Sequence, residues 1–174
     1  MKILFKKPLR FIVITTLCLI AVTLFVVIGC KNPKDTLITE NNLLQDTKWK
    51  LVGIVDAQGN TRILEPGDCA RCYILTFNTD STFIGNTAAN RLTGCYKVDY
   101  KTGALRIPWV FSTNIFDLLD ARQYLEILRN HIHSFSLQEN ELRLHYKENE
   151  AEYYLLYEPS SELPAGPIDL MECK

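Results

Sequence analysis

The sequence has few of the residues from which most enzyme sites are built. Among its 174 residues are 3 histidines and 8 glycines, and no serine, histidine and aspartate stand in the order of a known catalytic triad. No glycine-rich phosphate loop and no nucleophile elbow has the flanking strand and helix that these motifs require. We therefore expect a protein that is not an enzyme and that needs no cofactor.

Basic residues are scarce once the first 29 residues are set aside. The chain has 19 Lys+Arg and 20 Asp+Glu, and residues 1–29 contain four of the basic residues (Lys2, Lys6, Lys7 and Arg10) and none of the acidic ones. Without this segment, 19 − 4 = 15 basic and 20 acidic residues remain, a net charge of −5. The mild acidity and the absence of a basic cluster argue against nucleic acid as a partner and against electrostatic adhesion to anionic lipid.

Only one long hydrophobic run is present, and it occupies residues 11–29 without a charge. Because it follows a basic segment, residues 1–29 have the organisation of an export signal peptide. A run of this length can also span a membrane, which leaves an uncleaved signal anchor as the alternative. The sequence Val27-Ile28-Gly29-Cys30 resembles the bacterial lipobox, where a peptidase cuts before a cysteine that carries diacylglycerol. We therefore expect lipidation, including palmitate, at Cys30.

A lipid on Cys30 would make the chain a membrane-anchored protein of the cell envelope. Acyl chains contribute about 0.8 kcal/mol per buried CH₂, so two or more of them hold a protein on a bilayer. Lys31 follows the anchoring cysteine without an acidic cluster behind it, and we expect the periplasmic face of the outer membrane rather than surface display. Residues 30–42 then form a tether, residues 43–158 a single domain, and residues 159–174 a proline-containing tail.

Short segments that alternate apolar and polar residues dominate the domain, a pattern typical of a barrel or sandwich. The pattern predicts strands at residues 49–55, 73–77, 81–86, 92–100, 104–109, 134–137, 141–147 and 152–157. In the fifth of these, Leu105, Ile107 and Trp109 are expected to face inward. Residues 148–152 are predicted to form a charged hairpin turn.

One segment breaks the alternation and predicts a helix over residues 114–130. Leu118, Ala121, Leu125 and Leu128 fall at intervals of three and four, which places them on one apolar face. Asn114 and Asp117 lie where residues that cap a helix N-terminus are found. The fold class expected is α+β, a small antiparallel barrel-like sheet of about eight strands with one helix packed on it or plugging it.

The sequence Cys69-Ala70-Arg71-Cys72 is the strongest candidate for chemistry. Two thiols at this spacing can form a reactive disulfide or half of a zinc site. A thioredoxin-type site needs a helix after the first cysteine, but a strand is predicted there. Zinc would need two more ligands, which Cys95, Cys173 or the surface-located His131 and His133 could supply in principle.

We favour structural disulfides in an oxidising compartment over redox chemistry or metal binding. Of the 6 cysteines, four remain for pairing once Cys18 is cut away and Cys30 is acylated. Proximity favours Cys69 with Cys72. This choice leaves Cys95 and Cys173 either to pair or to stay free.

A set of residues along the domain resembles the META domain family. The set comprises Leu44, Thr47, Trp49 and Leu51, then Leu75-Thr76-Phe77 with Thr82-Phe83-x-Gly85, and Ala89-Asn90-Arg91-x-x-Gly94-x-Tyr96. With the order of the elements, it is similar to the small META-domain lipoproteins of Bacteroidales, although Ala89 stands where the family commonly has cysteine. The resemblance covers about residues 43–159. It implies a small barrel-like sheet with one helix, heat-shock-related members, and no established enzymatic activity.

Two classes of function are compatible with these features. In the first, the domain is a non-catalytic interaction, assembly or stress-related module at an envelope membrane, with an envelope protein as partner. In the second, it carries a lipid or another small hydrophobic ligand inside the barrel. The second class rests on residues 153–157, which are apolar on both faces and predict a strand covered on both sides, a geometry that can leave a hydrophobic slot.

Overall fold

The structure is a computed structural model that describes residues 44–138 and 140–164. Its elements in this part of the chain are the strands β1 (Thr47–Val55), β2 (Thr61–Arg62), β3 (Ile74–Phe77), β4 (Thr82–Asn86), β5 (Arg91–Asp99), β6 (Ala104–Ser112), β7 (Ile132–Gln138), β8 (Glu141–Glu148) and β9 (Ala151–Pro159), and the helix α2 (Leu119–Asn130). The helix falls between β6 and β7, as the interruption of the alternating pattern predicted. The two-residue strand β2 was not predicted.

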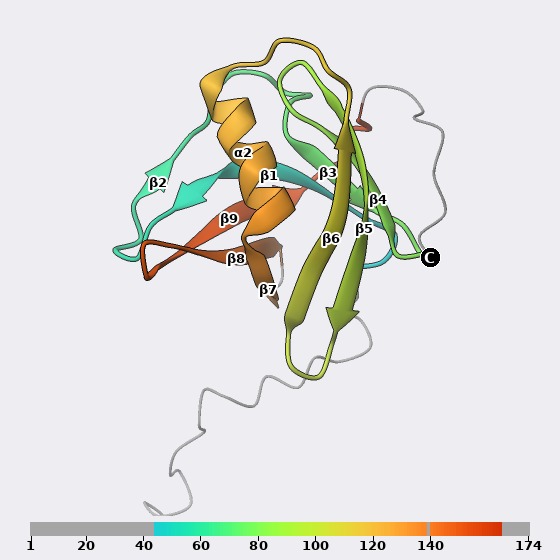
Figure 1. The fold of residues 1–174 in the computed structure, drawn as a ribbon, viewed down its shortest axis with the longest axis vertical. Coiled ribbons are helices and arrows are strands. Elements are labelled where there is room, and N and C mark those ends of the chain that lie inside the picture. The colour runs from blue at the N-terminus through green and yellow to red at the C-terminus, as the bar shows by residue number, and fades with distance from the viewer. Residues whose placement is uncertain (1–43, 139, 165–174) are drawn as a thin grey trace, which may run out of the picture. The chain divides into compact units, whose positions relative to one another are not determined.

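The strands form one antiparallel sheet that closes on itself (Figure 1). The strand order is β2-β1-β3-β4-β5-β6-β7-β8-β9, and β1 also pairs with β9, so eight strands make a closed barrel and β2 extends it beside β1. An eight-stranded barrel has an interior just wide enough for side chains to fill. The expected fold class, a small antiparallel barrel with one helix, is confirmed.

Alternate side chains along each strand point inward and form the barrel core. The fully buried side chains include Phe77, Phe83, Tyr96, Leu105, Leu144, Leu155 and Tyr157, each at a position where the strand turns its side chain inward. Two glycines allow the strands to approach one another. A Cβ at Gly94 would come within 2.5 Å of the Phe83 ring and of the Trp109 carbonyl, and a Cβ at Gly85 would meet the Ile74 carbonyl at the same distance.

The turn between β8 and β9 is the charged hairpin that the sequence predicted. Asn149 and Glu150 both have positive φ, 49° and 65°. Positive φ at both central residues is the mark of a type I′ turn, whose twist matches that of the flanking strands. Lys147 and Glu152 pair across the two strands beside this turn, with Nζ and Oε1 3.1 Å apart.

The inward position predicted for Trp109 is wrong. Cys95 pairs with Trp109 and Lys97 pairs with Arg106, so Tyr96 faces both Ile107 and Pro108. This extra residue is a β-bulge, which reverses the facing of the side chains that follow it. Trp109 is consequently 38% exposed and stacks on Phe111 outside the barrel.

The predicted start of the helix is also wrong, because α2 begins at Leu119 rather than near residue 114. Leu118 occupies the N-cap position without a side-chain cap, and neither Asn114 nor Asp117 caps the helix. The amide of Ile115 donates to Asn90 Oδ1, and Asn90 Nδ2 donates to the Ile115 carbonyl. Because Asn90 takes up these backbone groups, the segment before Leu119 stays non-helical.

The buried face of α2 differs from the predicted stripe. Ala121 and Leu128 are buried as expected, but Leu118 is 44% exposed and Leu125 is half-buried. Tyr124 and Ile127 occupy the centre of the buried face instead. The Tyr124 ring contacts the Tyr73 ring edge-on at 5.2 Å, and its hydroxyl lies 3.1 Å from that of Tyr157. This contact between the helix and the barrel core sets the rotation of α2.

The helix lies over the weakest junction of the barrel, between β6 and β7 (Figure 1). These strands share one register pair, Ala104 with Ser134, beside a hydrogen bond from Phe135 N to Gly103 O. The buried side of α2 covers the junction where the backbone ladder is this short. In the described residues, no helix is long and apolar enough to cross a membrane.

The prediction that β9 is covered on both faces is wrong. Leu155 and Tyr157 are fully buried, whereas Tyr154 and Leu156 on the opposite face are only partly buried. The helix covers the β6–β7 junction and not the outer face of β9, so among residues 44–138 and 140–164 no second layer of secondary structure covers this strand. The outward tyrosine is covered in part by Arg143, whose guanidinium lies 5.1 Å from the Tyr154 ring.

Candidate functional site

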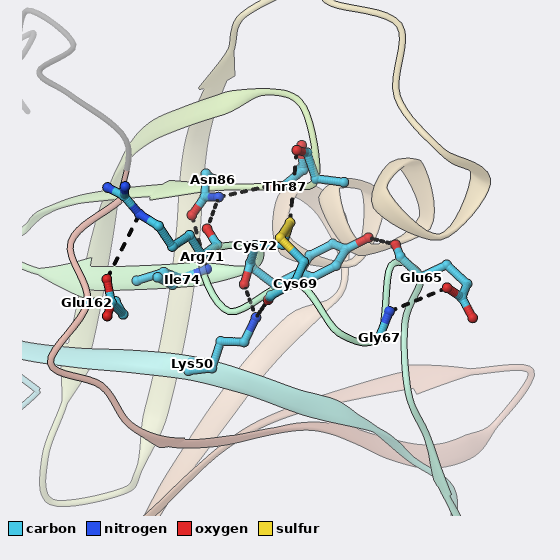
Figure 2. The surroundings of a disulfide bond; sticks show 12 residues. Lys50, Glu65, Gly67, Cys69, Arg71, Cys72, Ile74, Asn86, Thr87 and Glu162 are labelled. Atoms are coloured by element: carbon cyan, nitrogen blue, oxygen red, sulfur yellow. Dashed lines mark hydrogen bonds and ion pairs between the residues drawn. A yellow bond between two sulfur atoms is a disulfide. The ribbon is translucent and has the colours of Figure 1, made fainter.

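The sequence-predicted cysteine pair lies in the connection between β2 and β3, which we call the cysteine loop (residues 63–73). Cys69 and Cys72 are joined as a disulfide with their Cα atoms 5.4 Å apart, and Cys72 is buried (Figure 2). This is the pairing that proximity in the sequence favours. Cys95 on β5 is also disulfide-bonded, and not to either of these two, whereas Cys30 and Cys173 lie outside the described residues.

Side chains from β1 and β4 bind the backbone of the cysteine loop (Figure 2). Lys50 Nζ donates to the carbonyl oxygen of Cys69 at 2.7 Å and to that of Cys72. Asn86 Nδ2 donates to the Arg71 carbonyl at 2.6 Å, and Asn86 Oδ1 accepts from Ile74 N at 3.2 Å. The loop therefore has partners for backbone groups that would otherwise be buried and unsatisfied.

The ammonium group of Lys50 is part of this framework rather than a free cation. Burial lowers the pKa of Lys50, and the nearby Glu158 carboxylate opposes that shift. Its hydrogen bonds to two carbonyl oxygens replace the hydrogen bonds to water that the ammonium group loses on burial. The outer ion pair, Arg71 with Glu162 at 3.9 Å, joins two exposed side chains and adds little.

The surroundings of Cys69 and Cys72 differ from those of a thioredoxin-type site. Such a site places its first cysteine at a helix N-terminus, where the dipole lowers the thiol pKa. Here Cys72 is followed by Tyr73 and then by β3, and the helix of the described part starts far along the chain at Leu119. This arrangement suits a short covalent bridge that fixes the loop.

For metal binding, the described residues contain no group of three or more His, Cys, Asp or Glu side chains arranged to hold an ion. His131 ends α2, and His133 lies on β7 with its Nε2 3.5 Å from Glu152. The two histidines named as potential zinc ligands are thus not brought to Cys69 and Cys72. Their contacts are to other elements.

His145 is less exposed than a solvated surface residue would be. Its Nε2 lies 3.0 Å from Ser136 Oγ, and its ring packs 5.6 Å from the Tyr154 ring. Burial lowers the pKa of His145, with the neighbouring His133 acting in the same direction and Glu152 in the opposite one. The neutral imidazole is therefore the favoured form in the fold.

A second polar cluster, centred on Asn90, holds the segment between β6 and α2. Asn90 is 5% exposed, and its side chain binds both backbone groups of Ile115 and accepts from Thr113 Oγ1 at 3.0 Å. Asn90 Nδ2 also donates to Asp117 Oδ2 at 2.9 Å, and Thr87 donates to the same carboxylate oxygen. We call the segment that this cluster holds the apolar loop (residues 113–119).

The apolar loop presents its hydrophobic side chains to solvent. Phe116 is 87% exposed, Leu119 75%, Ile115 60% and Leu118 44%. The sequence contained a signal for this feature, because four apolar residues within 115–119 exceed what one helical face can bury. These residues were included in the predicted helix, so the exposed loop was not predicted.

Three residues that bind the two loops were missed as functional candidates. Lys50 and Asn86 carry no motif that marks them, and their role depends on strand pairing that local patterns do not encode. Asn90 belongs to the residues that carry the family resemblance, but its partners lie 23–27 residues further along the chain. The role of a buried polar residue can be recognised only when the positions of its hydrogen-bond partners are known.

The barrel interior is occupied by side chains. Tyr96, Tyr124, Tyr146, Tyr157, Phe77 and Phe83 are the largest of those with less than 2% exposure. A crevice of about 120 Å³ lies outside this core, where Gln123, Ile127 and His131 of the helix end meet Tyr146 and Glu148. Aromatic side chains thus occupy much of the interior in which a hydrophobic ligand was expected to lie.

These features define a class of protein: a small closed antiparallel barrel, covered at one junction by a single helix and fixed by a short disulfide. A family profile of the META domain matches residues 42–157. The chain belongs to the META domain family, as its residues had indicated.

Known proteins similar to this chain agree with that assignment. A protein of Tannerella forsythia described as "Putative lipoprotein" is 30% identical over 132 residues, which cover 76% of this chain and 85% of that protein. An NMR structure of a protein from Burkholderia xenovorans is 21% identical with a TM-score of 0.53, and covers 77% of this chain and 100% of its own. A crystal structure of a DUF4847 family protein from Bacteroides vulgatus is 16% identical with a TM-score of 0.55, and covers 70% and 98%. The two structures show a shared fold.

Proposed function

We propose that the chain is a lipid-anchored envelope protein whose domain acts by binding rather than by catalysis. In this proposal residues 1–29 are a signal peptide, Cys30 carries the lipid, and residues 30–42 tether the domain. The similarity to a protein described as a lipoprotein supports the anchor, as does the sequence Val27-Ile28-Gly29-Cys30. Lys31 after the anchor favours the periplasmic face of the outer membrane.

One observation carries the binding role. The strongest polar clusters of the described domain, around Asn86 and around Asn90, are directed at the backbone of their own loops. The large side chains left most exposed are instead apolar and gathered in the apolar loop. Exposed apolar groups of this kind mark contact surfaces more often than catalytic centres.

The disulfides belong to this proposal as structural bonds. In an oxidising envelope compartment the Cys69–Cys72 bond would persist and hold the cysteine loop against β1 and β4. With Cys18 removed and Cys30 acylated, Cys173 is the cysteine that remains for Cys95. This second bond would fix the C-terminal tail to β5.

The experiment is metabolic labelling with palmitate of the full chain and of Cys30→Ala in a bacterium that processes lipoproteins. The parent chain should take up label and lose residues 1–29, whereas Cys30→Ala should stay an unlabelled precursor. Cys18→Ala is the matched control, because this cysteine lies within the segment that is removed, and it should label normally. Unchanged labelling of Cys30→Ala would place the lipid elsewhere and refute the proposal.

The alternative function, that of a carrier of a hydrophobic ligand, has its own test. Native mass spectrometry of the protein extracted from its host would reveal a carrier by a mass adduct of defined size. The aromatic filling of the barrel leads us to expect the mass of the lipidated chain alone. A stoichiometric adduct would favour the carrier.

A further inference from the structure

The apolar loop (residues 113–119) has a composition that a free surface rarely shows. Its Phe116, Leu119 and Ile115 side chains are 87%, 75% and 60% exposed, and they lie within five consecutive residues. Ile63, 63% exposed, extends the surface, because the adjacent Arg62 and the Glu65 amide both bind Asp120 in the first turn of α2. Contiguous apolar surface of this kind marks a site of interaction with protein or membrane.

The exposure is maintained by the fold and does not result from a loose segment. Asn90 binds the amide and the carbonyl of Ile115 at 2.8 and 2.9 Å, which fixes the backbone immediately before Phe116. Asp117, 7% exposed, turns inward to Asn90 and to Thr87. With the residues on either side of it held, Phe116 is directed outward.

Arg122 contacts the apolar loop, and two further arginines, Arg129 and Arg91, are attached to the segment where the loop begins. The Arg122 guanidinium lies 5.8 Å from the Phe116 ring centroid, and Arg129 donates to Ser112 Oγ at 3.1 Å where the loop begins. The exposed Arg91 is joined to the loop through its amide, which donates to Thr113 Oγ1. Within residues 44–138 and 140–164, none of the three has a carboxylate at ion-pair distance.

We propose that the apolar loop inserts into the surface of the membrane to which the chain is anchored. Phe116, Leu119 and Ile115 enter the boundary of the acyl chains, and the arginines meet lipid phosphate groups. Without residues 1–29 the net charge of −5 argues against adhesion of the whole domain surface to anionic lipid, but locally an apolar tip with arginines beside it is the composition of segments that lie in the membrane interface. This inference rests on the proposed lipid anchor, since the anchor keeps a bilayer within reach of the loop.

The length of chain before the barrel allows this contact. Fourteen residue steps separate Cys30 from Leu44, the first described residue, and at about 3.4 Å per step they span at most about 48 Å. A compact domain of about 120 residues has a radius of gyration of about 14 Å. The tether therefore lets any face of the domain reach the bilayer, and the surface chemistry decides which face does.

Charge favours a lipid surface over a second copy of this chain. A two-fold dimer through the apolar loop would bring the same patch on both subunits together. Arg91, Arg122 and Arg129 of both subunits would then lie within or beside one interface, and the accumulated like charge opposes such an interface. Phosphate groups complement the same arginines.

The test is site-specific photo-cross-linking with the full lipidated chain in vesicles of phosphatidylethanolamine and phosphatidylglycerol. Photoreactive benzoylphenylalanine replaces Phe116 in one variant and Lys101 in the matched control. Lys101 is an exposed residue of the β5–β6 turn, at the end of the barrel away from the apolar loop (Figure 1). We expect several-fold more lipid adduct from position 116 than from position 101.

Two results would overturn the inference. Equal lipid labelling at positions 116 and 101 would show that the domain has no preferred face toward the bilayer. Adducts from position 116 to a second copy, or to another protein when the experiment is repeated in cells, would assign the loop to a protein interface. Failure of the chain to float with the vesicles would instead refute the proposed anchor, and flotation is measured on the same samples.

The contribution of the three arginines has its own test. The triple variant Arg91→Gln, Arg122→Gln and Arg129→Gln, carrying the probe at Phe116, should give several-fold less lipid adduct than the parent chain. Arg106→Gln is the matched control, because this exposed arginine of β6 lies toward the β5–β6 turn. Unfolding curves of each variant verify that the barrel is intact. An undiminished yield of lipid adduct in the triple variant would show that the arginines do not contribute by binding lipid phosphate groups.

Discussion

The barrel is closed in two different ways on two of its sides. Between β8, β9 and β1 the backbone ladders are long, with Leu142–Glu148 paired to Ala151–Tyr157, and β9 paired to β1 across one irregularity. Between β6 and β7 the strands share one register pair, and α2 covers the junction. Backbone hydrogen bonds close the first side, whereas side chains close the second.

This difference has a consequence for how each side responds to change. A ladder of backbone hydrogen bonds tolerates substitution of the outward side chains, because the bonds do not involve them. The helix-covered side depends on Tyr124 and Leu128, both almost fully buried, and on the hydrogen bonds of Asn90. We therefore expect the helix-covered side to be the more sensitive to point mutation, and the predictions below test this contrast.

The largest effect is expected for Leu128→Ala. This side chain is 1% exposed on the buried face of α2, and removing a buried leucine side chain costs about 2–5 kcal/mol. Leu125→Ala, at a half-buried position of the same helix, is the control and should cost clearly less. Chemical unfolding measures both, and equal losses would contradict the observed rotation of the helix.

The next largest effect is expected for Asn90→Ala. This variant should lose about 1–3 kcal/mol of unfolding free energy, because it leaves buried polar groups without a partner. Asn86→Ala, on β4 beside the cysteine loop, should cost a similar amount because it leaves the Arg71 carbonyl and the Ile74 amide without this partner. The two variants should differ in hydrogen exchange. Protection should fall at Ile115 in the first and at Ile74 in the second, and an unchanged Ile115 amide in Asn90→Ala would contradict the role given to Asn90.

Removal of the short disulfide should have a smaller effect. For Cys69→Ser with Cys72→Ser, the chain-entropy relation for a four-residue loop gives about 2 kcal/mol. Lys50 and Asn86 still bind the loop, so we expect the loss to stay at or below this value and the melting temperature to fall by a few degrees. Envelope function should be intact. Full stability combined with loss of function would refute the structural role of the bond and reopen redox or metal chemistry.

The smallest effect is expected from the titration of His145 on the ladder-closed side. Burial lowers its pKa in the fold, so the unfolded chain binds the proton more readily and stability rises with pH. The contribution is complete above the unfolded pKa of about 6.5. It is lost as pH falls through that value toward the lower folded-state pKa.

The matching variant is His145→Gln, which cannot titrate. Between pH ~7 and ~5 the unfolding free energy of the parent should fall relative to that of the variant. Urea unfolding at several pH values gives the difference directly. Curves that run parallel across this range would show that His145 is not desolvated in the fold.

Much of the architecture could be predicted because it depends on local patterns. Alternation of apolar and polar residues located the eight barrel strands, and turn residues separated them. The break in that alternation located the helix between the fifth and sixth predicted strands. The Cys69–Cys72 spacing favoured the bond that the structure contains, because two cysteines so close in the chain meet without long-range organisation.

The candidate site was less predictable, because its contacts join residues distant in the sequence. The bulge in β6 opposite Tyr96 turned Trp109 outward through the register of β5 and β6. Asn90 displaced the start of the helix by binding Ile115, 25 positions further along the chain. Both effects require the strands to be placed before the local conformation can be assigned.

The sequence by itself determined the eight barrel strands, the helix that interrupts them and the membership of the META domain family. Only the tertiary structure decided that β1 pairs with β9, which face of α2 is buried, and that Phe116 and Leu119 remain exposed. The physical reason is that a residue pattern states which side chains are suited to burial. Whether each one is buried depends on partners that strand pairing and helix packing bring from elsewhere in the chain.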